Sequence, residues 1–372
     1  MLLVAEPSLG EEEKKALAEI VDSGWITMGD RVRAFERAFA HAHKATDAVA
    51  VSSCTAGLHL VTKALGIGPG DEVLVPSLTF VATANSVLYA GAMPVFVDIE
   101  SLDVPLMSLA DASAKCSNKT KAVIVMHYAG YLIDGDAWRD FAKSRHLLLI
   151  EDAAHAAGLD RAGTFGDAAV FSFYGNKNMT TAEGGMVVAR YEEVLNTVRQ
   201  MRSHGMTSST LQRLSGNSAS YDVTMLGFNY RMDEFRAAIG LIQLTKLRSW
   251  NEKRKTLEKT YRRYMEEYCP SVSLPFAAPH PSSHHILPIL LPDGVNRQQV
   301  MDRLREAAIQ TTVHYPPVHW LSLYRNGFPS VHLPRTEEFA VREMTLPLHP
   351  KMEERQVEAV ASALASSLVL QH

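Results

Sequence analysis

A lysine that follows an apolar, strand-like run is the first residue whose position suggests chemistry. The segment Phe171–Asn178 reads FSFYGNKN, and Lys177 comes after its short Gly-Asn turn. A lysine in a partly desolvated pocket has a lowered pKa because burial disfavours the ammonium, and the neutral amine forms Schiff bases with carbonyl groups. The alternative is a solvated surface lysine, which is the commoner position of this residue in proteins. The segment therefore predicts a Schiff-base lysine and leaves the surface alternative open.

A second segment has the composition of an anion-binding turn. Ser52–Gly57 (SSCTAG) overlaps the end of a short apolar run and opens a run with helical spacing. Small residues at the start of a helix leave backbone N–H groups accessible, and the helix dipole favours negative charge there. We interpret this segment as a phosphate site. The alternative is an ordinary helix start with Thr55 near the N-cap.

Two adjacent acidic residues end another strongly apolar run. Glu151 and Asp152 close the run 146–152 (HLLLIED), and His155 follows three residues later. Ligands bind at the carboxyl ends of parallel strands, and a carboxylate buried there needs a partner because burying an isolated charge is costly. A protonated pyridine nitrogen is one such partner. An Asp152 that caps the next helix is the alternative, and the segment alone does not decide between them.

Other patterns do not indicate a site. Gly66–Gly70 (GIGPG) is rich in glycine, but it follows a helical run and precedes a strand, which is the reverse of a dinucleotide-binding loop. The 15 histidines show no metal-ligand spacing, and His284-His285 is interpreted as part of a strand with its role left open. The three cysteines are far apart, so neither a disulfide framework nor a metal site is predicted.

Strand-like and helix-like runs alternate along the first half of the chain. Apolar runs without a polar face predict strands buried on both sides, as in a parallel sheet covered by helices. A long helical pattern at 232–268 is expected to form one or two helices that join a large domain to a smaller one. The runs interpreted as strands are 48–53, 71–77, 94–99, 121–128, 146–152, 168–174, 184–190, 284–291 and 311–315, and the other helices are expected at 11–23, 58–65 and 136–146, after Asn296 and from about Met352.

The overall composition is that of an average soluble protein and excludes several classes of function. The chain has 372 residues, of which 47% are hydrophobic and 21% charged, with a formal net charge of −4. No basic patch suggests a nucleic-acid partner, and no apolar stretch approaches the roughly 20 residues of a membrane span. The amino terminus lacks the features of a signal peptide, and the few scattered cysteines fit a reducing compartment. A cytoplasmic protein is expected.

Taken together and in order, these segments resemble the DegT/DnrJ/EryC1/StrS family of sugar aminotransferases. The resemblance covers nearly the whole chain. It implies the fold type I architecture of enzymes that depend on pyridoxal 5'-phosphate (PLP), with a mostly parallel sheet in a large α/β domain at 1–245 and a smaller α+β domain at 246–372. The segments that carry it are GWITMGDRVRAFE (24–36), SSCTAGLHL (52–60), GDEVLVPSLTFVATANSVLYAGAMPVFVDI (70–99), EDAAHAAG (151–158), GDAAVFSFYGNKNMTTAEGGMVV (166–188), GFNYRMDEFRAAIGLIQL (227–244), VHYPPVH (313–319) and LPLHP (346–350).

The resemblance also implies roles for individual residues. Lys177 is implied to carry the cofactor as a Schiff base, and Asp152 to pair with the pyridine nitrogen. The active unit is implied to be a homodimer in which Asn229 reaches the phosphate of the neighbouring subunit; the alternative is that Asn229 caps the helix that follows it. Cys54 stands where relatives often have a smaller residue, with little effect expected on phosphate contacts made by backbone N–H groups. The other implied contacts are His155 near the ring hydroxyl, Thr55, Ala56 and Ser172 at the phosphate, Phe80 on the ring face and Tyr315 at the substrate.

The implied reaction is transfer of an amino group, with glutamate as the expected donor, to a keto group of a nucleotide-linked sugar. A 4-keto-6-deoxy or related 4-keto hexose is the leading substrate class, and the cofactor alternates with pyridoxamine 5'-phosphate (PMP). Three alternatives stay open: a keto-cyclitol acceptor, a PLP-dependent sugar lyase or dehydratase, and a regulatory PLP-fold protein without activity. The intact Lys177 counts against the last two, because the family's dehydratases have histidine at this position.

Overall fold

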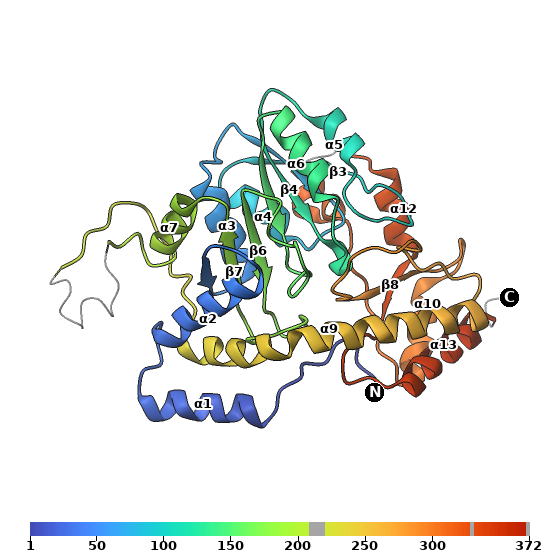
Figure 1. Cartoon of the computed structure of the whole chain (residues 1–372). Coiled ribbons are helices and arrows are strands. Elements are labelled where there is room, and N and C mark those ends of the chain that lie inside the picture. Colours follow the sequence, from blue (N-terminus) through green and yellow to red (C-terminus); the bar gives the residue numbers. More distant parts are fainter. Residues whose placement is uncertain (208–219, 328–330, 370–372) are drawn as a thin grey trace.

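A twisted sheet of seven strands forms the centre of the molecule (Figure 1). The computed structural model describes residues 1–207, 220–327 and 331–369. The strands lie in the order β1-β7-β6-β5-β4-β2-β3, and only β7 runs antiparallel to its neighbours within the described residues. The prediction of a mostly parallel sheet is therefore confirmed. The strands are β1 (Ala48–Val51), β2 (Glu72–Pro76), β3 (Met93–Val97), β4 (Thr120–Met126), β5 (Leu148–Asp152), β6 (Ala168–Ser172) and β7 (Gly185–Ala189).

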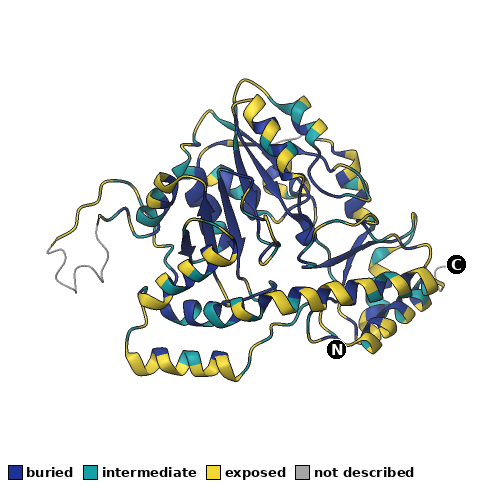
Figure 2. Cartoon of the chain, in the orientation of Figure 1, coloured by how far each residue is buried: buried dark blue, intermediate teal, exposed yellow. Residues whose placement is uncertain are grey.

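Helices cover both faces of this sheet, which explains why its strands have no polar face (Figure 2). One hydrophobic cluster joins the sheet to α2 (Asp30–Ala42), α5 (Leu109–Lys115) and α6 (Gly135–Ser144). A second cluster joins the opposite face to α3 (Cys54–Ala64), α4 (Ala82–Tyr89) and α7 (Glu192–Met201). Strands buried on both sides read as continuous apolar runs, so this layering produces the pattern seen in the sequence.

One long helix, α9 (Glu234–Tyr268), connects the large sheet to the rest of the chain (Figure 1). The side chain of Asp233 caps it by accepting a hydrogen bond from the N–H of Arg236 at 2.9 Å. The helix is 35 residues long, so the predicted pattern forms a single helix rather than two. The predicted domain boundary at 245/246 lies inside α9, and the division of the chain at that point stays a prediction.

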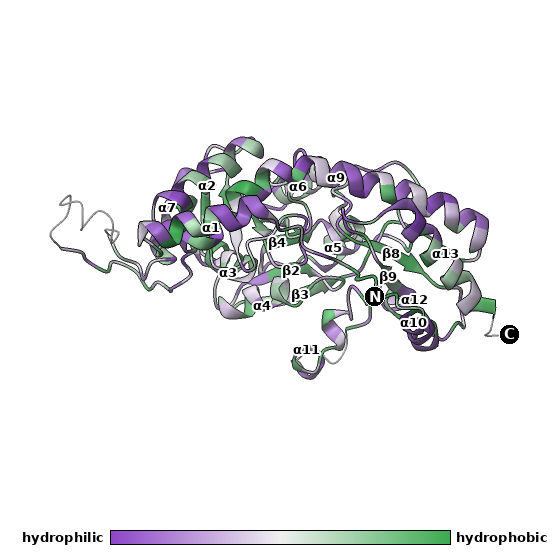
Figure 3. Ribbon diagram, turned by 90° about the horizontal axis from the view of Figure 1, so that it is seen from below, coloured by the Kyte–Doolittle hydropathy of each residue, from purple (hydrophilic) through white to green (hydrophobic). Residues whose placement is uncertain are grey.

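A smaller unit packs against the second half of α9. It contains the antiparallel pair β8 (Leu287–Leu290) and β9 (Glu343–Leu346), with α10 (Arg297–Glu306) and α13 (Glu354–Val369). Its own hydrophobic cluster includes residues of α9, so the long helix belongs to both cores. Seen from below, α9 and α10 carry mostly hydrophilic residues on their outward sides (Figure 3).

The structure differs from the predicted elements in the last quarter of the chain. The run 311–315 does not form a strand, and only Thr312 makes an isolated bridge, to Thr345. Two residues after Thr312, His314 donates its backbone N–H to the side chain of Glu343 at 3.0 Å instead of to the backbone of a neighbouring strand. Strand β9 was not predicted. The other elements of this region that the sequence pattern did not identify are α11 (Ser322–Gly327), α12 (Pro334–Arg342) and the 3-10 turn η2 (Val318–Trp320). A further 3-10 turn, η1 (Tyr128–Gly130), follows β4.

The parallel strands bring two of the predicted segments to one edge of the sheet. Asp152 is the last residue of β5 and Ser172 the last residue of β6, and these strands are parallel neighbours. The turn that carries Lys177 follows β6. Helix α1 (Glu11–Ser23), whose C-cap Gly24 has a left-handed φ of 67°, packs on α9 (Figure 1). Within the described residues, no helix is long and apolar enough to cross a membrane.

Candidate active site

The amino group of Lys177 lies in a largely enclosed position near Asp152. The backbone N–H of Lys177 donates a hydrogen bond to the carbonyl of Tyr174 at 3.0 Å, which fixes the turn after β6. Burial lowers the pKa of Lys177 to about 8, and the nearby Cys54 and Asp152 oppose that change only in part. An amine with this pKa is neutral in an appreciable fraction of molecules near neutral pH, which is the form that reacts with a carbonyl.

Asp152 is a buried carboxylate held by two neutral donors. Its Oδ2 accepts a hydrogen bond from the Thr83 hydroxyl at 2.7 Å, and its Oδ1 accepts one from the Ala154 N–H at 3.1 Å. Burial raises the pKa of Asp152, and these hydrogen bonds and the charges of Lys177 and His127 offset the increase only in part. A cation placed at this carboxylate would stabilise its ionised form. The contact with Ala154 is local, two residues along the chain, as in a capping interaction. The contact with Thr83 comes from a distant part of the chain, helix α4.

His155 and Tyr315 form a pair beside these two residues. The Nε2 of His155 lies 2.9 Å from the Tyr315 hydroxyl, and their rings are roughly parallel with centroids 6.1 Å apart. The other ring nitrogen, Nδ1, is buried and has no hydrogen-bond partner among the described residues. Burial lowers the pKa of His155 well below its ordinary value, so the ring is neutral. The pair joins the end of β5 in the large sheet to the segment around Tyr315, which follows α10 in the sequence.

The start of α3 lies against the ends of β6 and β7. Ser53, not Thr55, is the N-cap, and its side chain accepts a hydrogen bond from the Ala56 N–H at 3.1 Å. Gly185, the partner of Ser172 in the sheet, faces this loop so closely that an added Cβ would lie 2.7 Å from the backbone N of Cys54. Because the first N–H groups of a helix have no intrahelical acceptor, Thr55 and its neighbours form a site suited to an anion.

Phe80 has an exposed aromatic ring at the same edge. Its side chain is 53% exposed, and its ring centroid lies 6.0 Å from that of Tyr315. A large apolar ring left open beside polar groups provides a surface on which a planar ligand can stack.

Asn229 is placed differently from the other predicted residues. It is exposed, it forms an isolated backbone bridge with Ser203, and no hydrogen bond in the described part of the chain joins it to the rest of the site. Since Asp233 caps α9, the alternative in which Asn229 caps that helix is wrong. The neighbouring Tyr230 carbonyl accepts a hydrogen bond from the Ser52 N–H at 2.8 Å, so this segment lies beside the end of β1, an edge strand of the large sheet.

Comparisons with known proteins agree with this geometry. Residues 7–365 match the model of the DegT/DnrJ/EryC1/StrS aminotransferase family. The chain belongs to this family. Among solved structures it is similar to PseC of Helicobacter pylori, an aminotransferase of pseudoaminic acid biosynthesis, with 28% identity, 99% of each chain covered and a TM-score of 0.93. Spr1654 of Streptococcus pneumoniae, solved in its PMP form, has 28% identity, 99% coverage of each chain and a TM-score of 0.91. DesI, solved with its TDP-sugar product, has 30% identity over 100% of this chain and 95% of its own, with a TM-score of 0.87.

Enzymes of this family depend on PLP, and the residues of this aminotransferase fit that cofactor. The buried Asp152 offers a carboxylate to a protonated ring nitrogen, and the unpaired Nδ1 of His155 offers a polar atom near the ring. Phe80 presents a ring face, and the start of α3 with Ser172 offers donors for a phosphate. Among the described residues there is no group of three histidine, cysteine, aspartate or glutamate side chains that could hold a metal ion.

Two residues near the predicted site were not identified from the sequence. Thr83 lies within a helical run and has no distinguishing neighbour in the sequence, although its hydroxyl contacts Asp152. His285 was interpreted only as part of a strand, but its Nε2 lies 3.4 Å from the Nζ of Lys177. Both contacts join residues more than 65 positions apart, so only the folded chain reveals them.

The role of Asp152 can be tested with the substitution Asp152→Asn. An asparagine keeps an acceptor for Thr83 or Ala154 but removes the charge that a ring cation needs, so the fold should persist while kcat falls on the order of 10²-fold or more. The matched control is Asp134→Asn, because Asp134 caps α6 by accepting from the Ala137 N–H at 3.1 Å and asparagine caps helices equally well. Steady-state kinetics should show near-normal turnover for the control. Near-normal turnover in Asp152→Asn would reduce Asp152 to a local cap.

Proposed function

We propose that this aminotransferase moves an amino group from glutamate to a keto group of a nucleotide-linked sugar, with 4-keto hexoses as the leading class. The observation that carries this proposal is similarity over the full length to DesI, whose structure contains a TDP-sugar product, together with a lysine of lowered pKa beside a buried carboxylate. PseC, an aminotransferase involved in the biosynthesis of pseudoaminic acid, supports a role in biosynthesis.

Lys177, Asp152 and Thr83 have different roles in the proposed reaction. When bound, PLP supplies a pyridine ring that takes up electrons released at the substrate carbon. Lys177, with a pKa of about 8, accepts the proton from that carbon and returns a proton as an acid. The carboxylate of Asp152 holds a proton on the ring nitrogen, and that positive charge in turn keeps the carboxylate ionised against the effect of burial. Thr83 fixes the direction of the carboxylate.

In the proposed reaction, His155 and Tyr315 hold the pyridine ring of the cofactor and exclude water around it. His155 is neutral, and its contact with the Tyr315 hydroxyl couples its orientation to the segment that follows α10. That segment is fixed by the Tyr128 hydroxyl, which donates to the His314 carbonyl at 2.5 Å, and by Glu343. Burial raises the pKa of Glu343 to about 8, so this side chain supports the segment largely without a charge near neutral pH.

The substrate class can be tested in a half-reaction. The enzyme is first converted to its PMP form with glutamate, the keto-acid product is removed, and single keto compounds are then added. Nucleotide-linked 4-keto hexoses should restore the visible absorbance of the lysine-linked cofactor with the largest rate constants, whereas keto-cyclitols should act slowly or not at all. Lys177→Ala is the control that must not respond. A response to keto-cyclitols alone would favour that alternative, and turnover of a sugar without any amino donor would favour the lyase.

We also propose that the active unit is a homodimer in which Asn229 reaches the phosphate site of the other subunit. Asn229 is exposed. The next residue, Tyr230, contacts Ser52, which lies at the start of the predicted phosphate segment Ser52–Gly57 of the same chain. Large apolar side chains shortly before it in the sequence are exposed as well, as is Tyr89, and exposed apolar surface of this kind is available to a second subunit. These side chains are Tyr89, Tyr221, Val223 and Leu226, with Tyr89 linked to Phe228 through the ring of His59.

Subunit mixing tests the shared site. Lys177→Ala and Asn229→Ala are each expected to be strongly impaired, because one removes the Schiff-base lysine and the other a phosphate contact. After reassembly in equal amounts, about half of the dimers are mixed, and each mixed dimer has one site without either substitution, by the two-fold symmetry of the interface. Activity should recover to about a quarter of wild type by the same argument.

The contradictory result is equally clear. If Asn229 serves its own subunit, no site is repaired, and the mixture shows only the average of the two variants. Mass spectrometry of the intact dimers provides the control for subunit exchange.

A further inference from the structure

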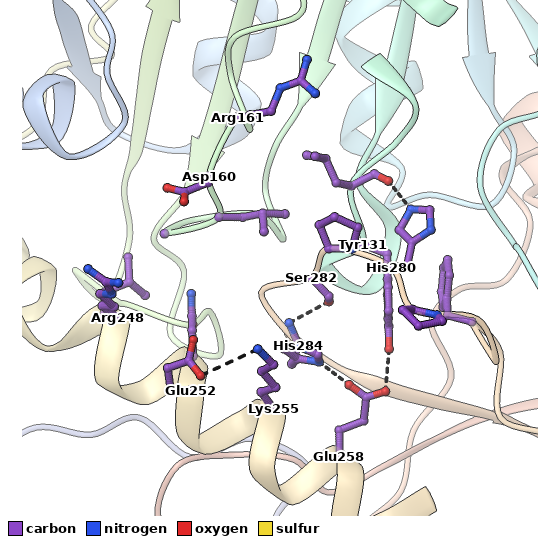
Figure 4. A pocket seen from close by; sticks show the side chains of 18 of the residues that line it. Tyr131, Asp160, Arg161, Arg248, Glu252, Lys255, Glu258, His280, Ser282 and His284 are labelled. Atoms are coloured by element: carbon purple, nitrogen blue, oxygen red, sulfur yellow. Dashed lines mark hydrogen bonds and ion pairs between the residues drawn. The ribbon is translucent and has the colours of Figure 1, made fainter. Parts of the chain in front are cut away.

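His285 lies next to a groove but does not line it. Ser282 and His284 of the same segment line this groove together with Glu258 of α9 and Tyr131. The preceding residue, His284, points into the groove, where its Nδ1 contacts the carboxylate of Glu258 next to Tyr131 (Figure 4). His285 points inward, is 3% exposed, and donates its backbone N–H to the Ala129 carbonyl at 3.0 Å. His284 has a left-handed φ of 51°, an uncommon conformation for a residue with a side chain, and this turn separates the directions of the two rings.

The hydrogen bonds around Asn178 determine which nitrogen of His285 carries the proton. The Nδ2 of Asn178 donates to Asn251 Oδ1 and to the Ser283 carbonyl, both at 2.8 Å, so its two hydrogens are both used. Its Oδ1 therefore faces the Nδ1 of His285, at 2.8 Å, and can only accept. The orientation of Asn251 is fixed in turn, because its Nδ2 donates to the Ala157 carbonyl at 3.0 Å.

It follows that Nδ1 of His285 carries the hydrogen and that Nε2 has a free lone pair. This lone pair lies 3.4 Å from the Nζ of Lys177. Burial also lowers the pKa of His285 well below its ordinary value, which keeps the imidazole neutral. The other titratable or charged groups that face Lys177 or His285 are Cys54, Asp152, His155, Arg254 and His314.

We propose that His285 is a positioning residue for Lys177, whose amino group it holds as a neutral hydrogen-bond acceptor whenever the lysine is not linked to the cofactor. In that state the lysine must keep its amine directed at the reacting carbon while it gains and loses a proton, and an acceptor that is itself never protonated cannot take the proton away. The inference rests on the proposed function through the assignment of Lys177. The chain Asn251–Asn178–His285–Lys177 thereby connects α9 to the catalytic amine.

The test measures the pKa of Lys177 in the full-length apoenzyme, a form in which the relative Spr1654 has also been solved. The protein is treated with acetic anhydride at a series of pH values, and acetylation of the peptide containing Lys177 is followed by mass spectrometry. The wild-type midpoint should lie near pH 8. In His285→Asn the amide occupies the position of Nδ1 and cannot reach the lysine. An acceptor that favours the ammonium is lost, and the midpoint should fall on the order of one pH unit.

The conservative variant His285→Gln separates positioning from a merely structural role. Its side-chain oxygen can occupy the position of Nε2, so its midpoint should stay close to wild type. Asn178→Leu should lower the midpoint like His285→Asn, because the imidazole is then free to place its hydrogen on Nε2. The control His284→Asn, one residue away on the groove side, should leave the midpoint unchanged.

Two results would overturn the proposal: a wild-type midpoint in His285→Asn, or equal shifts in His285→Asn and His285→Gln. Because the measurement needs no cofactor or substrate, it is independent of the proposed function. If borohydride reduction placed the cofactor on another lysine, the proposed function would fail while the contact between His285 and Lys177 could still be measured.

Discussion

The structure depends on one electrostatic constraint, a carboxylate and an amine buried near each other at one edge of a parallel sheet. Asp152 has only neutral hydrogen-bond donors, which leaves its pKa raised, and burial lowers the pKa of Lys177 to about 8. Neither group would be stable in its charged form without a partner, so the site is arranged for a ligand that brings a positive charge to the carboxylate and a carbonyl to the amine. PLP has both features.

Much of the fold around this pair maintains the burial. Strands β5 and β6 are parallel neighbours, so Asp152 and the turn that carries Lys177 lie at the same edge of the sheet. Thr83 of α4 contacts Asp152 there. The long helix α9 belongs to both hydrophobic units and carries Asn251, which orients Asn178 and through it His285. The polar side of the site is therefore built from contacts between residues that are distant in sequence, while the apolar layers only hold the elements in place.

The sequence predicted those features that depend on local pattern. The seven strands of the large sheet, the long helical pattern and the positions of Asp152 and Lys177 near strand ends follow from apolar runs and turn residues, whereas Ser172 followed from the family resemblance. The expected strand 311–315 is wrong, because His314 uses its N–H for a side-chain carboxylate, which no periodicity records. Thr83 and His285 gave no local signal in the sequence. Ser53 is the N-cap of α3, two residues before Thr55, which the alternative interpretation had placed near that cap. The order of the segments along the chain indicated the family, which no single motif did.

The most direct test of the account is to find which lysine carries the cofactor. The wild-type enzyme is loaded with PLP, reduced with borohydride, digested, and its peptides are analysed by mass spectrometry. The account predicts that the reduced cofactor is attached to the peptide containing Lys177, and that the Lys177→Ala variant has neither this modification nor the visible absorbance of the bound cofactor. Attachment to a peptide without Lys177 would contradict the assignment of the catalytic residue and the mechanism built on it.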